Sequence, residues 1–126
     1  MTYVLDSSAV LAFILSERGA EAVGECLPGA AISSVNLAEV VSVLCDRGWD
    51  DDGVRRMLAH LALECVGFDQ DQAERAGLLR RPTRHLGLSL GDRACLALAA
   101  ALNLPALTAD ARMAEFSDGV SVRLVR

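Results

Sequence analysis

Residues 3–9, Tyr3-Val4-Leu5-Asp6-Ser7-Ser8-Ala9, join a short apolar run to an acid and two hydroxyl side chains. The run is typical of a buried β-strand, and the residues over 7–16 have the apolar periodicity of a helix. A strand that leads directly into a helix is the repeating unit of α/β proteins. Further short apolar runs lie at 30–32, 65–68, 105–107 and 120–125. The sequence therefore predicts an α/β fold.

The polarity of these runs indicates where each strand lies in the sheet. The first four do not alternate between apolar and polar residues, which is typical of central strands covered on both faces of a parallel sheet. The run 120–125 does alternate, so we expect an edge strand there. Helices are predicted at 7–16, 18–26, 36–47, from 50–52 onwards, at 69–81 (ending before Pro82) and at 89–103. We expect one doubly wound domain over residues 1–126.

Composition limits the chemistry that this chain can perform. It has 126 residues, of which 52% are hydrophobic and 23% charged, and a formal net charge of -5. All 12 basic residues are arginine, which excludes P-loop nucleotide binding, Schiff-base catalysis and the lysine partner of a phospho-acceptor aspartate. An acidic chain is also a poor general binder of nucleic acid, because phosphate neutralisation supplies most non-specific affinity. Any contact with RNA or DNA must therefore rest on local charge.

The cysteines and the longest apolar run bear on location. Cys26, Cys45, Cys65 and Cys95 form no C-x-x-C pair, so the spacing does not indicate a zinc site. We expect reduced, mostly buried thiols and a reducing, cytoplasmic setting. The apolar N-terminus lacks the basic segment of a signal peptide, and the run 94–102 is too short to cross a bilayer.

Four acids are predicted to meet at one edge of the sheet. Asp6 and Asp110 each end an apolar run. Glu39 and Asp92 fall in the first turns of predicted helices. Ligands of an open parallel sheet bind at the carboxyl ends of its strands, where these positions meet. Two carboxylates about 5 Å apart repel by roughly 3 kcal/mol at an effective dielectric near 20, so such a cluster requires protons or cations.

Helix capping is the alternative interpretation of the same acids. Ser89–Asp92 fits a capping box and Asn36–Glu39 a looser one. Asp6 and Asp110 are each placed as helix N-caps. Capping explains each acid taken singly, but it does not predict that all of them converge.

Hard divalent ions are the cations that match carboxylate oxygens, which favours Mg²⁺ or Mn²⁺. The natural reaction of such a centre is the hydrolysis of a phosphodiester. One metal activates the attacking water, and a second, if present about 4 Å away, stabilises the leaving oxygen.

Each acid lies within a short motif, and the motifs follow one another in a distinctive order. They are Leu5-Asp6-Ser7-Ser8-Ala9, Ser33-Ser34-Val35-Asn36-Leu37-Ala38-Glu39, Leu88-Ser89-Leu90-Gly91-Asp92 and Leu107-Thr108-Ala109-Asp110. Over nearly the whole chain this set resembles the acidic motifs of PIN-domain ribonucleases, and more closely those of VapC toxins of bacterial toxin-antitoxin pairs. The resemblance implies a parallel sheet of order 3-2-1-4-5 with helices on both faces, Mg²⁺-dependent endoribonuclease activity, frequent homodimers and inhibition by a small VapB-type antitoxin.

The resemblance also implies a role for each acid. Asp6 and Asp92 would bind metal directly. Glu39 and Asp110 would be further ligands or would hold water. The hydroxyls that would orient these carboxylates belong to Ser7 and Thr108.

A group of arginines supplies the local charge that an RNA backbone needs. Residues 1–63 have a formal net charge of -5, whereas residues 64–126 have a formal net charge of zero. The predicted RNA contacts are Arg80, Arg81, Arg84, Arg93 and Arg112. Arg93 stands where many relatives in the resembled family have a small residue. A solvated helix end around Pro82 is the alternative interpretation of the first three.

Three other polar or aromatic residues are given no catalytic role. His60 lies between apolar neighbours in a predicted helix and is interpreted as structural. His85 is interpreted as incidental. Trp49 is interpreted as an anchor at a helix junction rather than a base-stacking platform, because aromatic residues make up only 4% of the chain.

Two other functions compete with a nuclease. A catalytically silent PIN-like binding module would use the acids only as caps and would dock a partner on an apolar face. A phosphoryl-transfer domain would use Asp6 as nucleophile. The absence of lysine opposes the second, and so does Ser8, where a phosphatase motif usually has another Asp.

Overall fold

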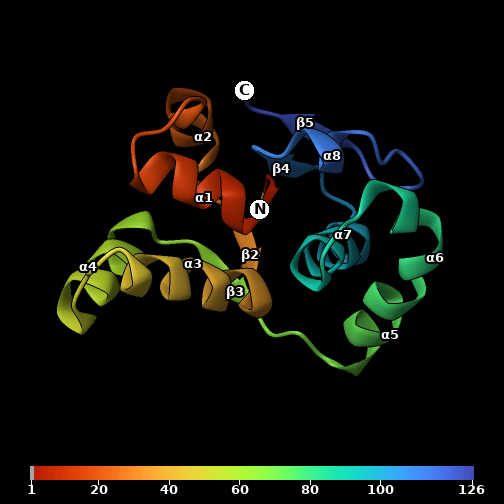
Figure 1. The fold of residues 1–126 in the computed structure, drawn as a ribbon, viewed down its shortest axis with the longest axis horizontal. Coiled ribbons are helices and arrows are strands. Elements are labelled where there is room, and N and C mark those ends of the chain that lie inside the picture. The colour runs from red at the N-terminus through yellow and green to blue at the C-terminus, as the bar shows by residue number, and fades with distance from the viewer. Residues whose placement is uncertain (1) are drawn as a thin grey trace.

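Strand β1 (Val4–Leu5) lies at the centre of a parallel five-stranded sheet of order β3-β2-β1-β4-β5 (Figure 1). The coordinates are a computed structural model that describes residues 2–126, so that Met1 of the predicted domain lies outside the described residues. The other strands are β2 (Ala31–Ser33), β3 (Glu64–Val66), β4 (Ala106–Thr108) and β5 (Val122–Leu124). The predicted α/β class and the sheet order 3-2-1-4-5 are confirmed.

The helices cover the sheet on both sides (Figure 1). On one side lie α1 (Ser7–Ile14), α2 (Ala20–Cys26), α3 (Ser34–Asp46) and α4 (Asp51–Leu61). On the other side lie α5 (Gln70–Leu78), α6 (Arg80–Thr83) and α7 (Leu90–Leu102). A 3₁₀ turn, η1 (Arg84–Leu86), leads towards α7, and the short α8 (Ala111–Ala114) lies between β4 and β5 in the chain.

Strand register divides the interior into two cores. Leu5 is paired in register with Ile32 and Leu107, and these side chains belong to the core under α1–α4. The preceding residue of each strand points to the opposite face. Val4, paired with Ala31 and Ala106, accordingly belongs to the core against α7. Consecutive apolar residues in the central strands, up to the polar Ser33 and Thr108 at their ends, thus follow from burial on both faces.

Three features of the predicted layout are wrong. The run at 65–68 was expected to be a central strand, but β3 lies at a sheet edge. The helix predicted over 69–81 ends at Leu78, and Pro82 lies inside α6. Proline is tolerated there because the first turn of a helix does not use its backbone N–H groups. Helix α8 was not predicted.

The thiols are less buried than expected. All of Cys26, Cys45, Cys65 and Cys95 are free in the structure, but only Cys26 and Cys95 are buried. Cys65 is exposed because β3 is an edge strand, and Cys45 lies on the outer surface of α3. Within residues 2–126, none of the helices has the length and apolar character that crossing a membrane requires.

Candidate active site

Asp6 is the buried centre of the site. It follows β1, is 2% exposed, and caps α1 by accepting a hydrogen bond from the backbone N of Ala9 on Oδ1 at 2.8 Å. Ser8 Oγ also donates to Oδ1, at 2.7 Å, and Thr108 Oγ1 donates to Oδ2. Burial raises the pKa of Asp6 to about 6, against the lowering effect of these hydrogen bonds, and the charge of Asp92 adds to the rise. Asp6 is therefore held rigidly, and its charge is poorly solvated.

Ser8 joins the ends of β1 and β4. Its Oγ accepts a hydrogen bond from the backbone N of Ala109 at 2.9 Å and lies 3.2 Å from Thr108 Oγ1. Thr108 Oγ1 in turn accepts from the backbone N of Asp110 at 3.0 Å. Sequence reasoning did not assign this role to Ser8. Its partner Ala109 is 101 positions away in the chain, so only the parallel pairing of β1 with β4 brings the two together.

Glu39 is held by three elements. Its Oε1 accepts hydrogen bonds from Ser7 Oγ and from Asn36 Nδ2, each at 3.0 Å. Asn36 Nδ2 also donates to the backbone O of Gly91 in α7, at 3.0 Å. A Cβ atom on Gly91 would overlap the Glu39 carboxylate. These contacts leave Oε2 of Glu39 with no hydrogen-bond donor among residues 2–126.

Asn36 and Gly91 are site residues that the sequence did not single out. The looser capping box predicted for Asn36–Glu39 is wrong, because Ser33 caps α3 by accepting from the backbone N of Val35. Asn36 lies inside the helix, 1% exposed, and bridges α3 to α7. Both features depend on a contact across 55 positions of sequence.

Asp92 is both a cap and a site acid. The predicted capping box is confirmed: the backbone N of Ser89 donates to Asp92 Oδ2 at 2.8 Å, and the backbone N of Asp92 donates to Ser89 Oγ at 3.2 Å. Oδ1 receives no hydrogen bond from the part of the chain that the structure describes. The carboxylate therefore keeps one oxygen available beside Asp6, whose pKa its charge raises.

Asp110 differs from the other acids because it is ion-paired. It caps α8, and Arg112 Nη2 lies 3.0 Å from its Oδ2. Partial burial alone would raise the pKa of Asp110, but the hydrogen bonds and charge of Arg112, together with the charge of Arg126, outweigh burial and lower it. Arg126, which sequence reasoning missed, is anchored by a 3.0 Å hydrogen bond from its Nε to the backbone O of Ala109.

Contacts link three of the four acids: Glu39 accepts a hydrogen bond from Ser7, which follows Asp6, and lies against Gly91, which precedes Asp92. Burial raises the pKa of Cys95, and so do the charges of Asp6, Asp92 and Glu39, in that order. The available donors are carboxylate oxygens, which suit Mg²⁺ or Mn²⁺. In residues 2–126 no group of three acidic, histidine or cysteine side chains is already arranged to hold an ion. Mg²⁺ usually keeps several waters and uses one or two carboxylates, so this donor set fits it.

Comparison with known proteins identifies the family of this chain. The model of the PIN domain family matches residues 3–119. The chain belongs to the PIN domain family. PIN domains are generally nucleases. No curated protein sequence matches the chain.

Solved structures of this PIN domain's fold include several from toxin-antitoxin pairs. A toxin-antitoxin complex from Klebsiella pneumoniae is 24% identical, with a TM-score of 0.76 over 94% of this chain and 95% of that one. VapBC2 from Rickettsia felis, bound to promoter DNA, is 21% identical, with a TM-score of 0.75 over 98% of both chains. VapBC-5 from Mycobacterium tuberculosis is 29% identical, with a TM-score of 0.63 over 99% of this chain and 98% of that one. The resemblance to PIN-domain VapC proteins is confirmed.

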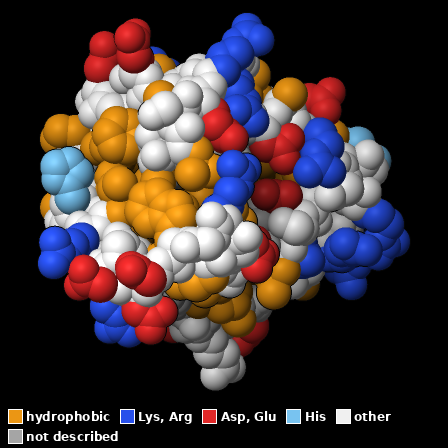
Figure 2. All heavy atoms as spheres, turned by 60° about the vertical axis from the view of Figure 1, so that its left-hand side comes forward, with side chains coloured by type: hydrophobic (Ala, Val, Ile, Leu, Met, Phe, Trp, Pro, Cys, Tyr) orange, Lys and Arg blue, Asp and Glu red, His pale blue; other side chains and the backbone are white. Residues whose placement is uncertain are grey.

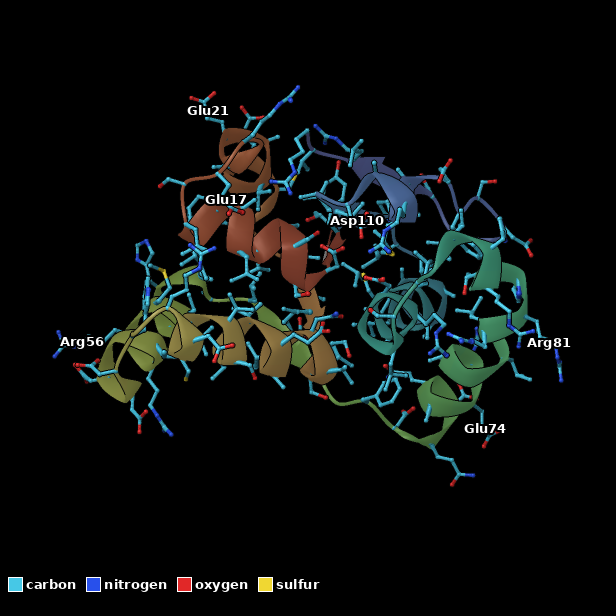
Figure 3. All side chains as sticks on the ribbon, viewed as in Figure 1. Glu17, Glu21, Arg56, Glu74, Arg81 and Asp110 are labelled. Carbon is cyan, nitrogen blue, oxygen red and sulfur yellow. The ribbon has the colours of Figure 1, made fainter. Side chains whose placement is uncertain are left out.

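Four of the five arginines predicted to contact RNA fall into two groups by exposure and contacts, and the fifth, Arg112, is the ion-pair partner of Asp110. Arg80, Arg81 and Arg84 are exposed on α6 and η1, and Figure 3 shows Arg81 pointing outwards, away from Asp110. Arg93 instead reaches from α7 to α5, where its Nη1 donates to the backbone O of Ala76 at 2.9 Å. Its Nε is buried with no partner in residues 2–126. Arg93 therefore links two helices, whereas the other three are open to solvent.

The structure also places the two histidines and the tryptophan for which the sequence indicates no catalytic role. His60 is exposed in the last turn of α4, and its interpretation as structural stays a prediction. His85 is exposed in η1. Trp49 packs against the core under α1–α4, which confirms its interpretation as an anchor beside the start of α4.

Proposed function

We propose that this PIN domain is a metal-dependent endoribonuclease and the toxin of a VapBC-type toxin-antitoxin pair that acts in the cytoplasm. The observation that carries the proposal is the cluster of Asp6, Glu39 and Asp92. These carboxylates come from three different elements, and contacts between neighbouring residues support their grouping: Glu39 accepts a hydrogen bond from Ser7, which follows Asp6, and lies against Gly91, which precedes Asp92. Each is fixed by hydrogen bonds, while Glu39 and Asp92 keep one oxygen apiece without a donor among residues 2–126.

The proposed cofactor is Mg²⁺, with Mn²⁺ as a substitute. Asp6 and Asp92 would hold it directly, and Glu39 and Asp110 would add ligands or hold water. A divalent ion bound there would lower the pKa of the attacking water and stabilise charge on the phosphate. Ser8 and Thr108 keep the Asp6 carboxylate in place, and Ser7 does the same for Glu39. Such supporting contacts typically change metal affinity or activity by about 10- to 100-fold when removed.

The proposed substrate is RNA, bound by its phosphates. Arg80, Arg81 and Arg84 are exposed, and none forms an ion pair with the described part of the chain. Gly87, which ends η1, lies beside Arg112, since Arg112 Nη1 is 3.4 Å from its backbone O. A phosphate backbone that left the acids could therefore follow cationic side chains along η1 and α6.

The proposed protein partner is a VapB-type antitoxin, and the toxin itself is proposed to form a homodimer. Partly buried apolar side chains of α1, α3 and α4 surround the core on one side, among them Phe13, Ile14, Leu37, Val41 and Met57. Figure 2, which turns the left-hand side of Figure 1 towards the viewer, shows hydrophobic side chains gathered in the middle of this face. An apolar patch of this kind is typical of a protein interface, and an antitoxin segment is its proposed occupant.

RNA cleavage tests the proposed activity. The wild type should cut a panel of structured RNAs in Mg²⁺ or Mn²⁺ and not in EDTA. Asp6→Asn should lose the activity. Asp50→Asn is the matched control, because Asp50 also caps a helix, α4, but lies outside the site. Equal cleavage by wild type and Asp6→Asn, or none by either, would contradict the proposal.

A thermal melt separates the nuclease from a catalytically silent binding module. The capping contacts of Asp6, Asp92 and Asp110 would be sufficient for the silent module, which predicts no effect of divalent ions on stability. The nuclease predicts that Mn²⁺ raises the unfolding midpoint, because an ion that binds only the folded state stabilises it. Asp92→Asn should abolish that rise.

A further inference from the structure

Arg112 contacts both carboxylate oxygens of Asp110. Its Nη2 lies 3.0 Å from Asp110 Oδ2, and its Nε lies 3.4 Å from Asp110 Oδ1. The backbone N of Arg112 also donates to Oδ1, at 2.9 Å. The third nitrogen, Nη1, is 3.4 Å from the backbone O of Gly87, which fixes the guanidinium over the carboxylate.

This pairing sets Asp110 apart from the other acids. Asp6, Glu39 and Asp92 accept hydrogen bonds from neutral hydroxyl, amide and backbone groups, so their negative charge is not cancelled by a cation. Asp110 is neutralised by its own neighbour in α8. The pKa of Arg112 is raised by Asp110 first and, more weakly, by Asp92, so the guanidinium lies within the electrostatic field of the cluster.

The Arg112–Asp110 ion pair is partly exposed to solvent, so its two side chains can separate. The side chain of Arg112 is 58% exposed and that of Asp110 is 24% exposed. Exposed ion pairs contribute little net stability, because solvent screens them and holding two side chains in place has an entropic cost. A divalent ion carries twice the charge of a guanidinium and therefore attracts a carboxylate more strongly at the same distance.

We propose that Arg112 is the built-in counter-ion of the site: it occupies Asp110 in the metal-free protein and has to leave that carboxylate before a divalent ion can use it. The inference rests on the proposed function only in taking Asp110 as part of the metal centre. A guanidinium that has left Asp110 is free to contact a phosphate, as the proposed RNA contact at this position requires.

A titration with Mn²⁺ alone tests the inference without RNA or catalysis. Free Mn²⁺ is followed by electron paramagnetic resonance as it is added to the full chain. Arg112→Gln removes the competing cation, so it should bind Mn²⁺ about two- to fivefold more tightly than the wild type, the ratio that corresponds to an exposed ion pair. In an Asp110→Asn background, where there is no carboxylate to release, Arg112→Gln should raise the affinity less than it does in the wild-type background, because only the longer-range effect of its charge remains.

Arg126→Gln is the matched control. It removes the same charge beside Asp110, but Arg126 hydrogen-bonds the backbone O of Ala109 and not the carboxylate. A smaller gain in Mn²⁺ affinity than that of Arg112→Gln is expected. An equal gain would attribute the effect to charge alone and overturn the inference. Wild-type binding with no gain in Arg112→Gln would overturn the inference and leave the proposed nuclease standing, whereas no binding by either protein would overturn both.

Discussion

Gly91 leaves space for the carboxylate of Glu39. A Cβ atom built on Gly91 would overlap both oxygens and Cδ of that side chain. The two residues come from α7 and α3, so the absence of a side chain at Gly91 sets how closely these helices approach beside the site. Asn36 Nδ2 strengthens the same approach by donating to Gly91 O and Glu39 Oε1.

Gly91→Ala should therefore damage the site more than it helps the helix. Alanine favours a helix over glycine by about 1 kcal/mol. A Cβ would overlap only the flexible end of Glu39, which can move aside by giving up its hydrogen bonds to Ser7 and Asn36. We expect little net change in stability but a fall in RNA cleavage of about tenfold or more, since Glu39 has to move. Urea unfolding and cleavage assays measure the two effects.

Gly77→Ala is the control for that substitution. Gly77 lies in α5, and nothing lies within 4 Å of a Cβ atom placed there. The same exchange should stabilise the protein by about 0.5–1 kcal/mol and leave cleavage unchanged. If Gly91→Ala behaved like Gly77→Ala, the fit between Gly91 and Glu39 would not matter for function.

Asp6 should make the metal-free protein less stable as the pH rises. Its pKa is raised from 3.8 to about 6 on folding, so the folded state binds the proton more tightly than the unfolded chain. The contribution of Asp6 to the free energy of unfolding is therefore complete below about pH 4 and is lost as the pH rises through 6. The rise in pKa corresponds to about 3 kcal/mol. The side chain in Asp6→Asn does not titrate, so this dependence of stability on pH is absent from the variant.

The measurement is urea unfolding in EDTA at several pH values, for wild type and Asp6→Asn. The stability of the wild type relative to the variant should fall between pH 4 and pH 7, because only the wild type has to bury a charge. A bound divalent ion compensates that charge, so Mn²⁺ should stabilise the wild type more at pH 7.5 than at pH 5. A difference between the two proteins that stayed constant with pH would contradict the burial argument.

Asn36→Ala should loosen Glu39 without removing it. The change deletes one of the two side-chain donors to Glu39 Oε1 and the hydrogen bond from Asn36 to the backbone O of Gly91. Each lost hydrogen bond costs about 1 kcal/mol, partly offset because Asn36 Oδ1 is itself buried with no partner in residues 2–126. Mn²⁺ affinity should fall along with stability. Ser42→Ala on the same helix removes only an exposed bond to the backbone O of Ala38 and should change neither.

The placement of the acids was predictable because the rule behind it is topological. Parallel strands end at one edge of the sheet, so Asp6 after β1 and Asp110 after β4 had to lie near each other. Helix capping and a candidate site are also compatible uses of the same acids. Strand ends lead into helix N-termini at this edge, and one carboxylate oxygen of Asp92 caps α7 while the other stays available.

What the sequence did not predict depends on contacts between distant segments. Ser8 reaches Ala109 across 101 positions, and Asn36 reaches Gly91 across 55. Apolar periodicity carries no information about such polar bridges. The exposure of Cys65 was missed for a related reason, because the run around it is apolar whether its strand lies at the centre or at the edge of the sheet.

The exposed arginines of α6 and η1 should determine how strongly salt weakens RNA binding. Each phosphate contact on single-stranded nucleic acid adds about 0.7 to the slope of log affinity against log salt, so replacing Arg80, Arg81 and Arg84 by glutamine should reduce that slope by up to about 2. Fluorescence anisotropy with a labelled RNA measures it, with Asp6→Asn present in every protein to prevent cleavage. Arg47, Arg55 and Arg56 provide a control with the same change of charge, because they lie at or near α4, far from α6, as the labels of Arg56 and Arg81 in Figure 3 show. An equal reduction in the control would mean that RNA responds to net charge and not to this surface.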